Sequence, residues 1–200
     1  MTPGPRGSVS PLSLVPPDPP LSDGVIILRP LDERDLSTIE RAASDTEIRK
    51  WFDLHRRTPT EYLAAKREGW TQGTGASFAI CDATRPNTSL GHVFIERDDE
   101  GRGSIGYWLL EDSRGKGRAT RAVLLAASWA RPEMQLGRLQ LHTDPANVAS
   151  QRVAARAGFA REGILRAHNR RRDGTRTDAF VYSLLPRDLA SSRITDSSSE

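Results

Sequence analysis

The sequence predicts a single domain of the α/β class, in which helices pack on one sheet. Three strand-like segments follow one another in the middle of the chain without a helix between them, which is typical of an antiparallel meander. Helical and strand-like segments then alternate as far as a closing pair of strands. The length of 200 residues fits one domain with short appendages rather than two domains.

Capping residues mark the starts of the helices in the first half. Asp32 precedes apolar residues at helical spacing, Ser44 or Asp45 precedes a short segment, and Thr58 stands before Pro59. Side-chain oxygens at the N-cap accept hydrogen bonds from unpaired backbone N–H groups, and proline fits the first helical position because it lacks an N–H. We therefore expect helices over residues 32–43, about 45–52 and 58–70.

Apolar runs of strand length, bounded by turn-forming residues, predict the strands. The expected strands are residues 25–28, 76–81, 90–96, 104–110, 136–142, 159–166 and 177–184. Two further helices lie between the later strands. They are residues 115–130, whose alanine-rich face suits close packing on a sheet, and residues 147–157. Pro132 is expected to end the first of these helices and Gly158 the second.

Composition bounds the domain and excludes several classes of protein. Residues 1–20 hold seven of the 13 prolines and the C-terminal segment is mostly small and polar, so we expect disordered tails at 1–23 and 187–200 around a domain at 24–186. No apolar run reaches the length of a membrane span, which predicts a soluble, cytoplasmic protein with no membrane partner. Cys81 is the one cysteine and cannot form an internal disulfide, and the four histidines show no metal-ligand spacing, so we expect no metal.

Two glycine motifs compete for the role of an anion-binding loop. Gly101, Gly103 and Gly106 match the pattern GxGxxG, but they lead into a strand instead of opening a helix, so we interpret them as a hairpin turn. The segment 114–119, RGKGRA, lies between a strand and the alanine-rich helix. Glycines there let successive N–H groups converge on an anion, and the helix dipole and three basic side chains add positive potential. The segment is not a P-loop, since Gly117 follows the lysine where a P-loop has Ser or Thr.

In combination, these segments resemble the GNAT superfamily of acyltransferases. The strand IGYWLL followed by RGKGRA and a helix is similar to its (Q/R)xxGx(G/A) motif for the pyrophosphate of acyl-CoA. The segments DTEIRKWF, LQLHTD, NVASQRVAARAGF, REGILR and DAFVYSLL resemble the RimJ/RimL-like branch, which acetylates N-terminal amines of ribosomal proteins. The resemblance covers roughly residues 24 to 186. It implies the GNAT fold, a mixed and partly splayed central sheet flanked by helices, with acetyl-CoA as the acyl donor.

The resemblance also implies how the two substrates are held. It places the pyrophosphate on the backbone amides of residues 115–120, the pantetheine arm along residues 109–111 and at Asn147, and the acceptor amine beside Trp51 and Phe52. The residues that it implies for acetyl-CoA are Leu109, Glu111, Arg114, Gly115, Lys116, Gly117, Arg118, Ala119, Thr120 and Asn147.

For the chemical step, the resemblance implies a backbone N–H near Leu110 as the oxyanion donor and Ser150 as a hydroxyl near the CoA sulfur. Ala154 stands where other members carry a tyrosine, so that proton donor is missing. The chain also lacks the family's glutamates at two positions, where it has His142 and His168. His142 ends a strand beside the predicted splay, and an imidazole suits a base at neutral pH. His168, in a predicted strand-to-loop region beside a basic run, is a second candidate. Ordered water is the other alternative, because a protein α-amine with a pKa near 8 is already partly neutral at pH 7.5.

Other conspicuous residues are expected to have structural roles. Glu96 is interpreted as a surface residue, Trp108 as a core aromatic and the run 170–172 as a solvated basic loop. The net charge of +3 with a pI near 9.4 fits an anionic ligand or nucleic acid and selects neither. Acidic residues interleave with the basic ones throughout the chain, which argues against a continuous basic face for nucleic acid.

The sequence thus predicts an N-acetyltransferase that moves an acetyl group from acetyl-CoA to a primary amine by direct attack in a ternary complex. A protein N-terminal α-amine, such as that of a ribosomal protein, is the preferred acceptor. The alternatives are a small-molecule amine such as an antibiotic or metabolite, a succinyl donor, an acyl-CoA-binding sensor without catalysis, and a nucleic-acid-binding module. The oligomeric state is left open, with a homodimer among the options.

Overall fold

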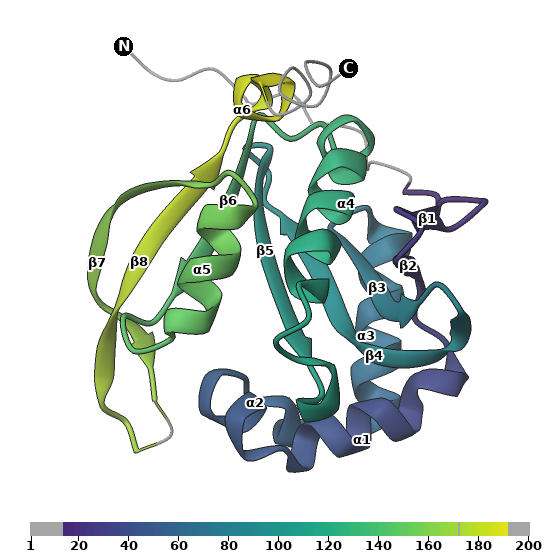
Figure 1. Cartoon of the computed structure of the whole chain (residues 1–200). Helices are drawn as coiled ribbons and strands as arrows, with labels where there is room; N and C mark the ends of the chain where they lie inside the picture. The colour runs from purple at the N-terminus through teal and green to yellow at the C-terminus, as the bar shows by residue number, and fades with distance from the viewer. Residues whose placement is uncertain (1–13, 172, 192–200) are drawn as a thin grey trace.

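The structure, a computed structural model, describes residues 14–171 and 173–191. This part of the chain forms one eight-stranded sheet in the order β1-β2-β3-β4-β5-β6-β8-β7, with helices on both faces (Figure 1). The strands are β1 Leu21–Ser22, β2 Ile26–Pro30, β3 Gly75–Asp82, β4 Arg85–Arg97, β5 Arg102–Leu109, β6 Arg138–Thr143, β7 Ala160–Arg170 and β8 Arg176–Leu184. The α-helices are α1 Leu36–Ser44, α2 Thr46–Trp51, α3 Pro59–Gln72, α4 Arg118–Glu133, α5 Val148–Arg156 and α6 Pro186–Ser191, and the 3-10 helices are η1 Glu33–Asp35, η2 Leu54–Arg56 and η3 Glu111–Ser113.

The predicted helix starts in the first half are confirmed. Asp32 caps η1, which continues directly into α1. Asp45 caps α2, because its Oδ1 accepts from the N–H groups of Glu47 at 2.9 Å and Ile48 at 3.0 Å. Thr58 and Glu61 form a reciprocal capping box at the start of α3.

Helix α4 differs from its predicted range at both ends. It begins at Arg118 instead of residue 115, because Gly115 and Gly117 have φ values of 75° and 72°, outside the helical region. It extends to Glu133 and includes Pro132, which was expected to end it. A proline in the last turn does not end the helical hydrogen bonding, because the N–H of Met134 still donates to the carbonyl of Ala130 at 2.8 Å.

The meander of β3, β4 and β5 is antiparallel, as predicted. Gly101 has a φ of 75° in the turn between β4 and β5, which confirms that GxGxxG marks a hairpin rather than an anion-binding loop. Strand β6 runs parallel to β5, but the two pair over only three positions, from Arg102 opposite Arg138 to Ser104 opposite Gln140. The rest of β5 has no strand neighbour on that side, so the sheet splays as predicted.

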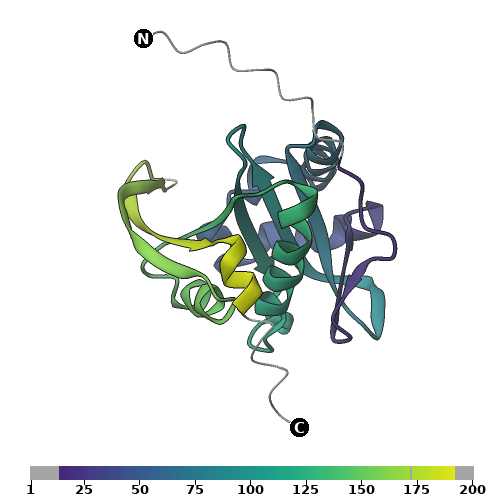
Figure 2. The same ribbon diagram turned by 90° about the horizontal axis from the view of Figure 1, so that it is seen from above.

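The two faces of the sheet carry different helices. Alternate residues of β3 show this: Phe78 and Ile80 belong to one core with the alanine face of α4, whereas Ala79 and Cys81 belong to a second core with α1 and α3. Helices α4 and α5 therefore cover one face and α1 to α3 the other (Figure 2). The hairpin of β7 and β8 extends beyond both layers, on the far side of the splay.

The domain extends beyond its predicted bounds of residues 24 and 186 at both ends of the chain. Residues 14–23 were assigned to a disordered tail, but Leu14 is buried in the main core and β1 pairs with β2 through Leu21 opposite Leu28. Two leucines among the prolines supply enough apolar surface to dock this segment. At the other end α6 extends to Ser191. The remaining parts of the predicted tails, 1–13 and 192–200, lie outside the described residues. None of the described helices is long and apolar enough to cross a membrane.

Candidate active site

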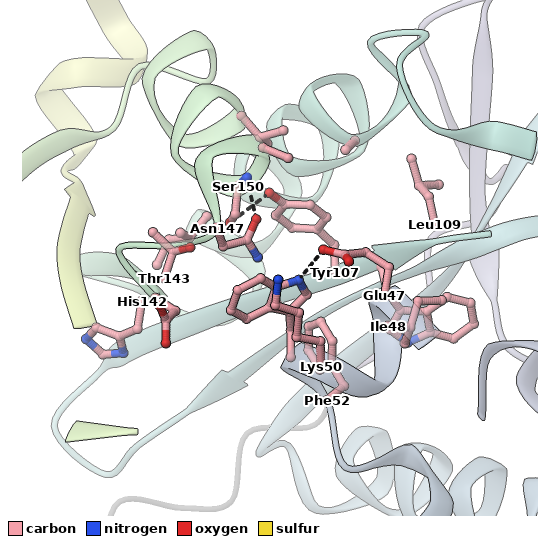
Figure 3. A pocket seen from close by; sticks show the side chains of 18 of the residues that line it. Glu47, Ile48, Lys50, Phe52, Tyr107, Leu109, His142, Thr143, Asn147 and Ser150 are labelled. Atoms are coloured by element: carbon pink, nitrogen blue, oxygen red, sulfur yellow. Dashed lines mark hydrogen bonds between the residues drawn. The ribbon is translucent and has the colours of Figure 1, made fainter. Parts of the chain in front are cut away.

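A cleft of about 1050 Å³ lies where β5 and β6 separate (Figure 3). It is lined from one face of the sheet by the start of α4 and by α5, from the other face by α2, and along its length by the free edge of β5. Residues from the end of β6 and the β7–β8 hairpin close the opposite side. The splay thus gives one cavity access to both faces of the sheet.

The predicted anion-binding loop lies in this cleft. Gly115, Gly117 and the first helical residues Arg118, Ala119 and Thr120 all line it. The N–H groups of a first helical turn have no partner within the helix, and Gly117 caps α4 without a side-chain hydrogen bond. A Cβ atom added at Gly115 or Gly117 would meet no atom within 4 Å. The loop therefore offers open space edged by backbone donors, which suits an anion.

Two arginines of the loop are neutralised by carboxylates from distant parts of the chain. The guanidinium of Arg114 lies 2.6 Å from Asp45 Oδ2 and that of Arg118 lies 2.7 Å from Asp82 Oδ2. Hydrogen bonds from Thr84, followed by the Arg118 guanidinium, lower the pKa of Asp82 to about 2, so this carboxylate is ionised at neutral pH. The backbone N–H groups and the helix dipole are consequently the main attraction for an anion here.

Two residues expected to bind acetyl-CoA do not line the cleft. Lys116 is exposed and its ammonium donates to the carbonyl of Asp112 at 2.9 Å, within the loop itself. Glu111 is also exposed and begins the turn η3, because β5 ends at Leu109. The extended backbone that could pair with a linear ligand therefore stops before Glu111. Neither residue lines the cleft, and contact of either with acetyl-CoA stays a prediction.

The backbone donors at the edge of β5 are those of Tyr107 and Leu109, and the prediction for Leu110 is wrong. The N–H of Leu110 donates to the carbonyl of Leu90 on β4 at 2.9 Å. Hydrogen-bonding directions alternate along an antiparallel strand, so the N–H and C=O groups of Tyr107 and Leu109 point away from β4, toward the cleft. The carbonyl of Leu109 confirms this direction, since it accepts from Arg114 Nε at 2.9 Å.

Ser150 lies in the cleft and is joined to a residue that sequence reasoning missed. The hydroxyl of Tyr107 donates to Ser150 Oγ at 3.1 Å, and the Ser150 N–H donates to Asn147 Oδ1 at 3.0 Å (Figure 3). Asn147 is therefore the N-cap of α5, and it also lines the cleft as expected. Strand alternation with Ile105 could have placed the Tyr107 side chain on the face of α4 and α5, but only the fold brings α5 against it.

Thr143, at the end of β6, is a second residue that the sequence did not single out. Its side chain is buried and lines the cleft, yet its Oγ1 has no hydrogen-bond partner among the described residues. A buried hydroxyl without a partner is costly, so a bound molecule with a polar group at this position would relieve that cost.

The two histidines lie together, but only one of them faces the cleft. His142 is half-buried and lines the cavity, while His168 is exposed and lies outside the lining, with its ring centre 5.0 Å from that of His142. Burial, followed by the charges of His168 and Arg138, lowers the pKa of His142 below its ordinary value of 6.5. His142 is consequently neutral at pH 7 and able to accept a proton.

The α2 side of the cleft is aromatic and carries a carboxylate. Trp51 and Phe52 line it as predicted, and Phe52 makes an edge contact with Phe94 of β4 at a centroid distance of 6.3 Å. Glu47, one turn before Trp51, also lines the cleft and accepts from the indole Nε1 at 2.8 Å. Glu47 lies within the segment DTEIRKWF, but its direction depends on how α2 docks on the sheet.

Of the residues expected to have structural roles, some line the cleft and others do not. Glu96 pairs on the surface with Lys66 at 3.0 Å and does not line the cleft. Trp108 is buried in the core of α1 and α3, with part of its surface on the cleft. Arg170 and Arg171 line the cleft, and Arg171 lies 3.4 Å from Asp144. Arg172 lies outside the described residues. Within the described chain, no three His, Cys, Asp or Glu side chains gather closely enough to hold a metal ion.

Comparison with known families identifies the fold and the enzyme class. Residues 26–160 match the model of the acetyltransferase (GNAT) domain. The chain belongs to this family. This GNAT acetyltransferase is 26% identical over 176 residues to the uncharacterized N-acetyltransferase p20 of Bacillus licheniformis, covering 82% of the chain and 95% of the relative. The predicted resemblance and the prediction of an acetyltransferase are therefore confirmed.

Solved structures of the RimJ and RimL enzymes share the fold of this GNAT acetyltransferase. RimJ of Mycobacterium smegmatis, in complex with CoA-disulfide, superposes with a TM-score of 0.72 at 23% identity, over 94% of this chain and 95% of RimJ. The ribosomal L7/L12 α-N-protein acetyltransferase RimL, in complex with coenzyme A, gives a TM-score of 0.69 at 18% identity, over 85% of this chain and 98% of RimL. The mixed, splayed sheet is thus the architecture of these enzymes.

Proposed function

We propose that this protein transfers the acetyl group of acetyl-CoA to a protein N-terminal α-amine. The observation that supports this most is the cleft, which joins the open helix start of α4 and the free edge of β5 on one face to the aromatic pocket of α2 on the other. A donor with an anionic end can enter from one face and an amine from the other. The two would meet at the gap between β5 and β6.

The donor side of the cleft fits acetyl-CoA on three counts. The glycines of the loop leave space beside unpaired N–H groups for the pyrophosphate. The N–H groups of Tyr107 and Leu109 face the cleft, where a linear amide-containing arm can pair with them as a further strand would. The buried Thr143 hydroxyl lacks a partner that a bound molecule could supply. Acetyl-CoA, when bound, supplies an acetyl group activated as a thioester.

Residues of both faces would act on the reacting groups. His142 would take one proton from the amine as the new C–N bond forms, because it is neutral at pH 7 and lines the cleft. The N–H of Tyr107, the residue in contact with Ser150, would hold the carbonyl oxygen as negative charge builds on it, and the N–H of Leu109, two residues along the strand, would stay paired with the arm. Ser150 would donate a hydrogen bond to the sulfur as the C–S bond breaks and leaves its electron pair there.

The α2 side is suited to an N-terminal amine. Glu47 would attract the ammonium form of the acceptor, and Trp51 and Phe52 would pack against its first side chain. The name of the RimL neighbour, an α-N-protein acetyltransferase, points to the same class of acceptor. An α-amine also demands less of the base than a lysine amine, whose pKa is near 10.4.

The proposal is tested with acetyl-CoA and peptides beginning with Ser, Ala or Thr, each carrying one internal lysine, with release of free thiol as the readout. The same peptides with a formyl group on the α-amine serve as matched controls. We expect the free peptides to be acetylated at the α-amine and the formylated peptides to be inert. Turnover of the formylated peptides, or of a panel of small amines alone, would contradict the α-amine acceptor. Absence of acetyl-CoA binding would contradict the donor.

A further inference from the structure

We propose that Tyr107 is a positioning residue that acts through Ser150. Its hydroxyl donates a hydrogen bond to a lone pair of the Ser150 oxygen, and this directs the serine's own proton at the sulfur of the acyl donor. This inference rests on the proposed function, which puts that sulfur beside Ser150.

The geometry joins two elements that are far apart in sequence. Tyr107 is in the part of β5 that pairs with β4 but has no strand neighbour on the side of β6, and Ser150 is in the first turn of α5. Their hydroxyl oxygens lie 3.1 Å apart, and both residues line the cleft (Figure 3). The N-cap bond from Asn147 Oδ1 to the Ser150 N–H holds the backbone of the serine. The serine is thus fixed from two sides.

The direction of the hydrogen bond decides what Ser150 can do. A serine hydroxyl has one proton to donate and two lone pairs to accept with. A serine in a helix commonly donates that proton to a backbone carbonyl in the preceding turn, which would leave nothing for a ligand. Among the hydrogen bonds of the described residues, Ser150 Oγ takes part in the one from Tyr107, as an acceptor. Its proton therefore remains available to the cleft.

Tyr107 is suited to this task because it stays protonated. Its partial burial raises the pKa of the phenol to about 12, so it remains a donor at any pH at which the enzyme could work. The same raised pKa prevents it from giving up its proton to a thiolate, whose conjugate acid has a pKa near 8.5. Tyr107 thus orients Ser150 and does not itself protonate the product.

The first test measures the bound product directly. The thiol of CoA bound to the protein is titrated by the ultraviolet absorbance of its thiolate, in wild type, Tyr107→Phe, Ser150→Ala and the double variant. A hydrogen bond to the thiolate favours the charged form, so we expect the bound thiol to have a lower pKa than free CoA. Tyr107→Phe should move this pKa toward the free value, and the double variant should match Ser150→Ala.

Tyr62→Phe is the matched control for this substitution. Tyr62 is a buried tyrosine whose hydroxyl lies 2.7 Å from His92 Nδ1, and it does not line the cleft. The variant Tyr62→Phe therefore loses one hydroxyl and its hydrogen bond to another side chain, as Tyr107→Phe does. We expect it to lower the melting temperature and to leave the thiol pKa of bound CoA unchanged.

The second test uses kcat for peptide acetylation. Tyr107→Phe should lower kcat about threefold to tenfold while the Kd for acetyl-CoA stays within about twofold, as expected for one hydrogen bond that matters in the transition state. In the Ser150→Ala background the same substitution should have less than about a twofold effect.

Two results would overturn the proposal: a thiol pKa in Tyr107→Phe equal to that of wild type, or an effect of Tyr107→Phe that persists undiminished without Ser150. If no amine is acetylated but the thiol titration follows the expected pattern, the proposed function fails and the positioning role of Tyr107 stands. Absence of CoA binding would overturn both.

Discussion

Gly117→Ala should separate the anion-binding role of the loop from its effect on folding. Gly117 has a φ of 72°, where a non-glycine residue costs about 1 to 2 kcal/mol. No atom lies within 4 Å of the added Cβ, so strain and not collision sets the loss of stability. At about 2 to 4 °C per kcal/mol, the melting temperature without ligand should fall by about 2 to 8 °C.

The effect on acetyl-CoA binding can be estimated as well. At a concentration of 100 times Kd, wild type gains about 2.7 kcal/mol, which corresponds to a thermal shift of about 5 to 11 °C. A methyl group in the open space should displace the anion from at least one backbone N–H. Since a hydrogen bond to a charged group contributes about 1.5 to 3 kcal/mol, Kd should rise about tenfold or more. At the same ligand concentration the stabilisation then falls to about 1.4 kcal/mol or less, and the thermal shift to about half.

Gly24→Ala is the control, measured by the same thermal shift assay. Gly24 has a φ of 82° and equally open surroundings, but it lies in the turn between β1 and β2, outside the cleft. Both variants should lose similar stability without ligand, and Gly24→Ala should keep the full shift with acetyl-CoA. A full shift in Gly117→Ala would refute the reasoning that the loop holds the anion.

Three further predictions concern the base, the loop and the acceptor pocket. Wild type should show an inflection below pH 6.5 in the pH profile of kcat/KM, because protonation of the His142 imidazole, whose pKa is lowered, removes the base. His142→Gln should abolish this inflection and His168→Gln should keep it. An identical profile in both variants would favour water as the base. Asp82→Asn should lower the melting temperature at pH 7. The difference in melting temperature from wild type should narrow as the pH falls from about 4 toward 2, because a carboxylate with a lowered pKa stabilises the fold only while it is ionised. A difference that does not depend on pH would contradict this. Trp51→Ala should raise KM for the acceptor peptide about fivefold to tenfold while the Kd for acetyl-CoA stays within about twofold. A change in acetyl-CoA affinity alone would mean that Trp51 contacts the donor and not the acceptor.

Local features of the fold were readable from the sequence because their causes are local. The capping box of Thr58 and Glu61 and the cap at Asp45 need only residues within three positions of each other. The glycine pair before α4 was recognised as a turn that could bind an anion, but the helix was predicted to begin at residue 115, three residues before its actual start at Arg118. The order of motifs along the chain was sufficient to indicate the family, and with it the cleft residues Ser150, Asn147, Trp51 and Phe52.

The chemistry within the cleft depended on pairings that the sequence does not specify. Leu110 and Leu109 look equivalent in sequence, but the register of β5 on β4 turns the N–H of Leu110 into the sheet and that of Leu109 toward the cleft. Hydrogen-bonding direction alternates with every residue, so an error of one position exchanges a buried donor for a free one.

Long-range contacts decided the rest. The arginines of the loop are neutralised by Asp45 and Asp82, which lie 69 and 36 residues away, so a charge count of the loop overstated its positive potential. Tyr107 meets Ser150 across 43 residues because β5 and β6 part and α5 packs beside the exposed edge. Sequence determined which residues are present at the ends of the elements. The tertiary structure decided which of their polar groups are already used by the protein and which remain for a ligand, because each polar group can be satisfied only by what the fold brings to it.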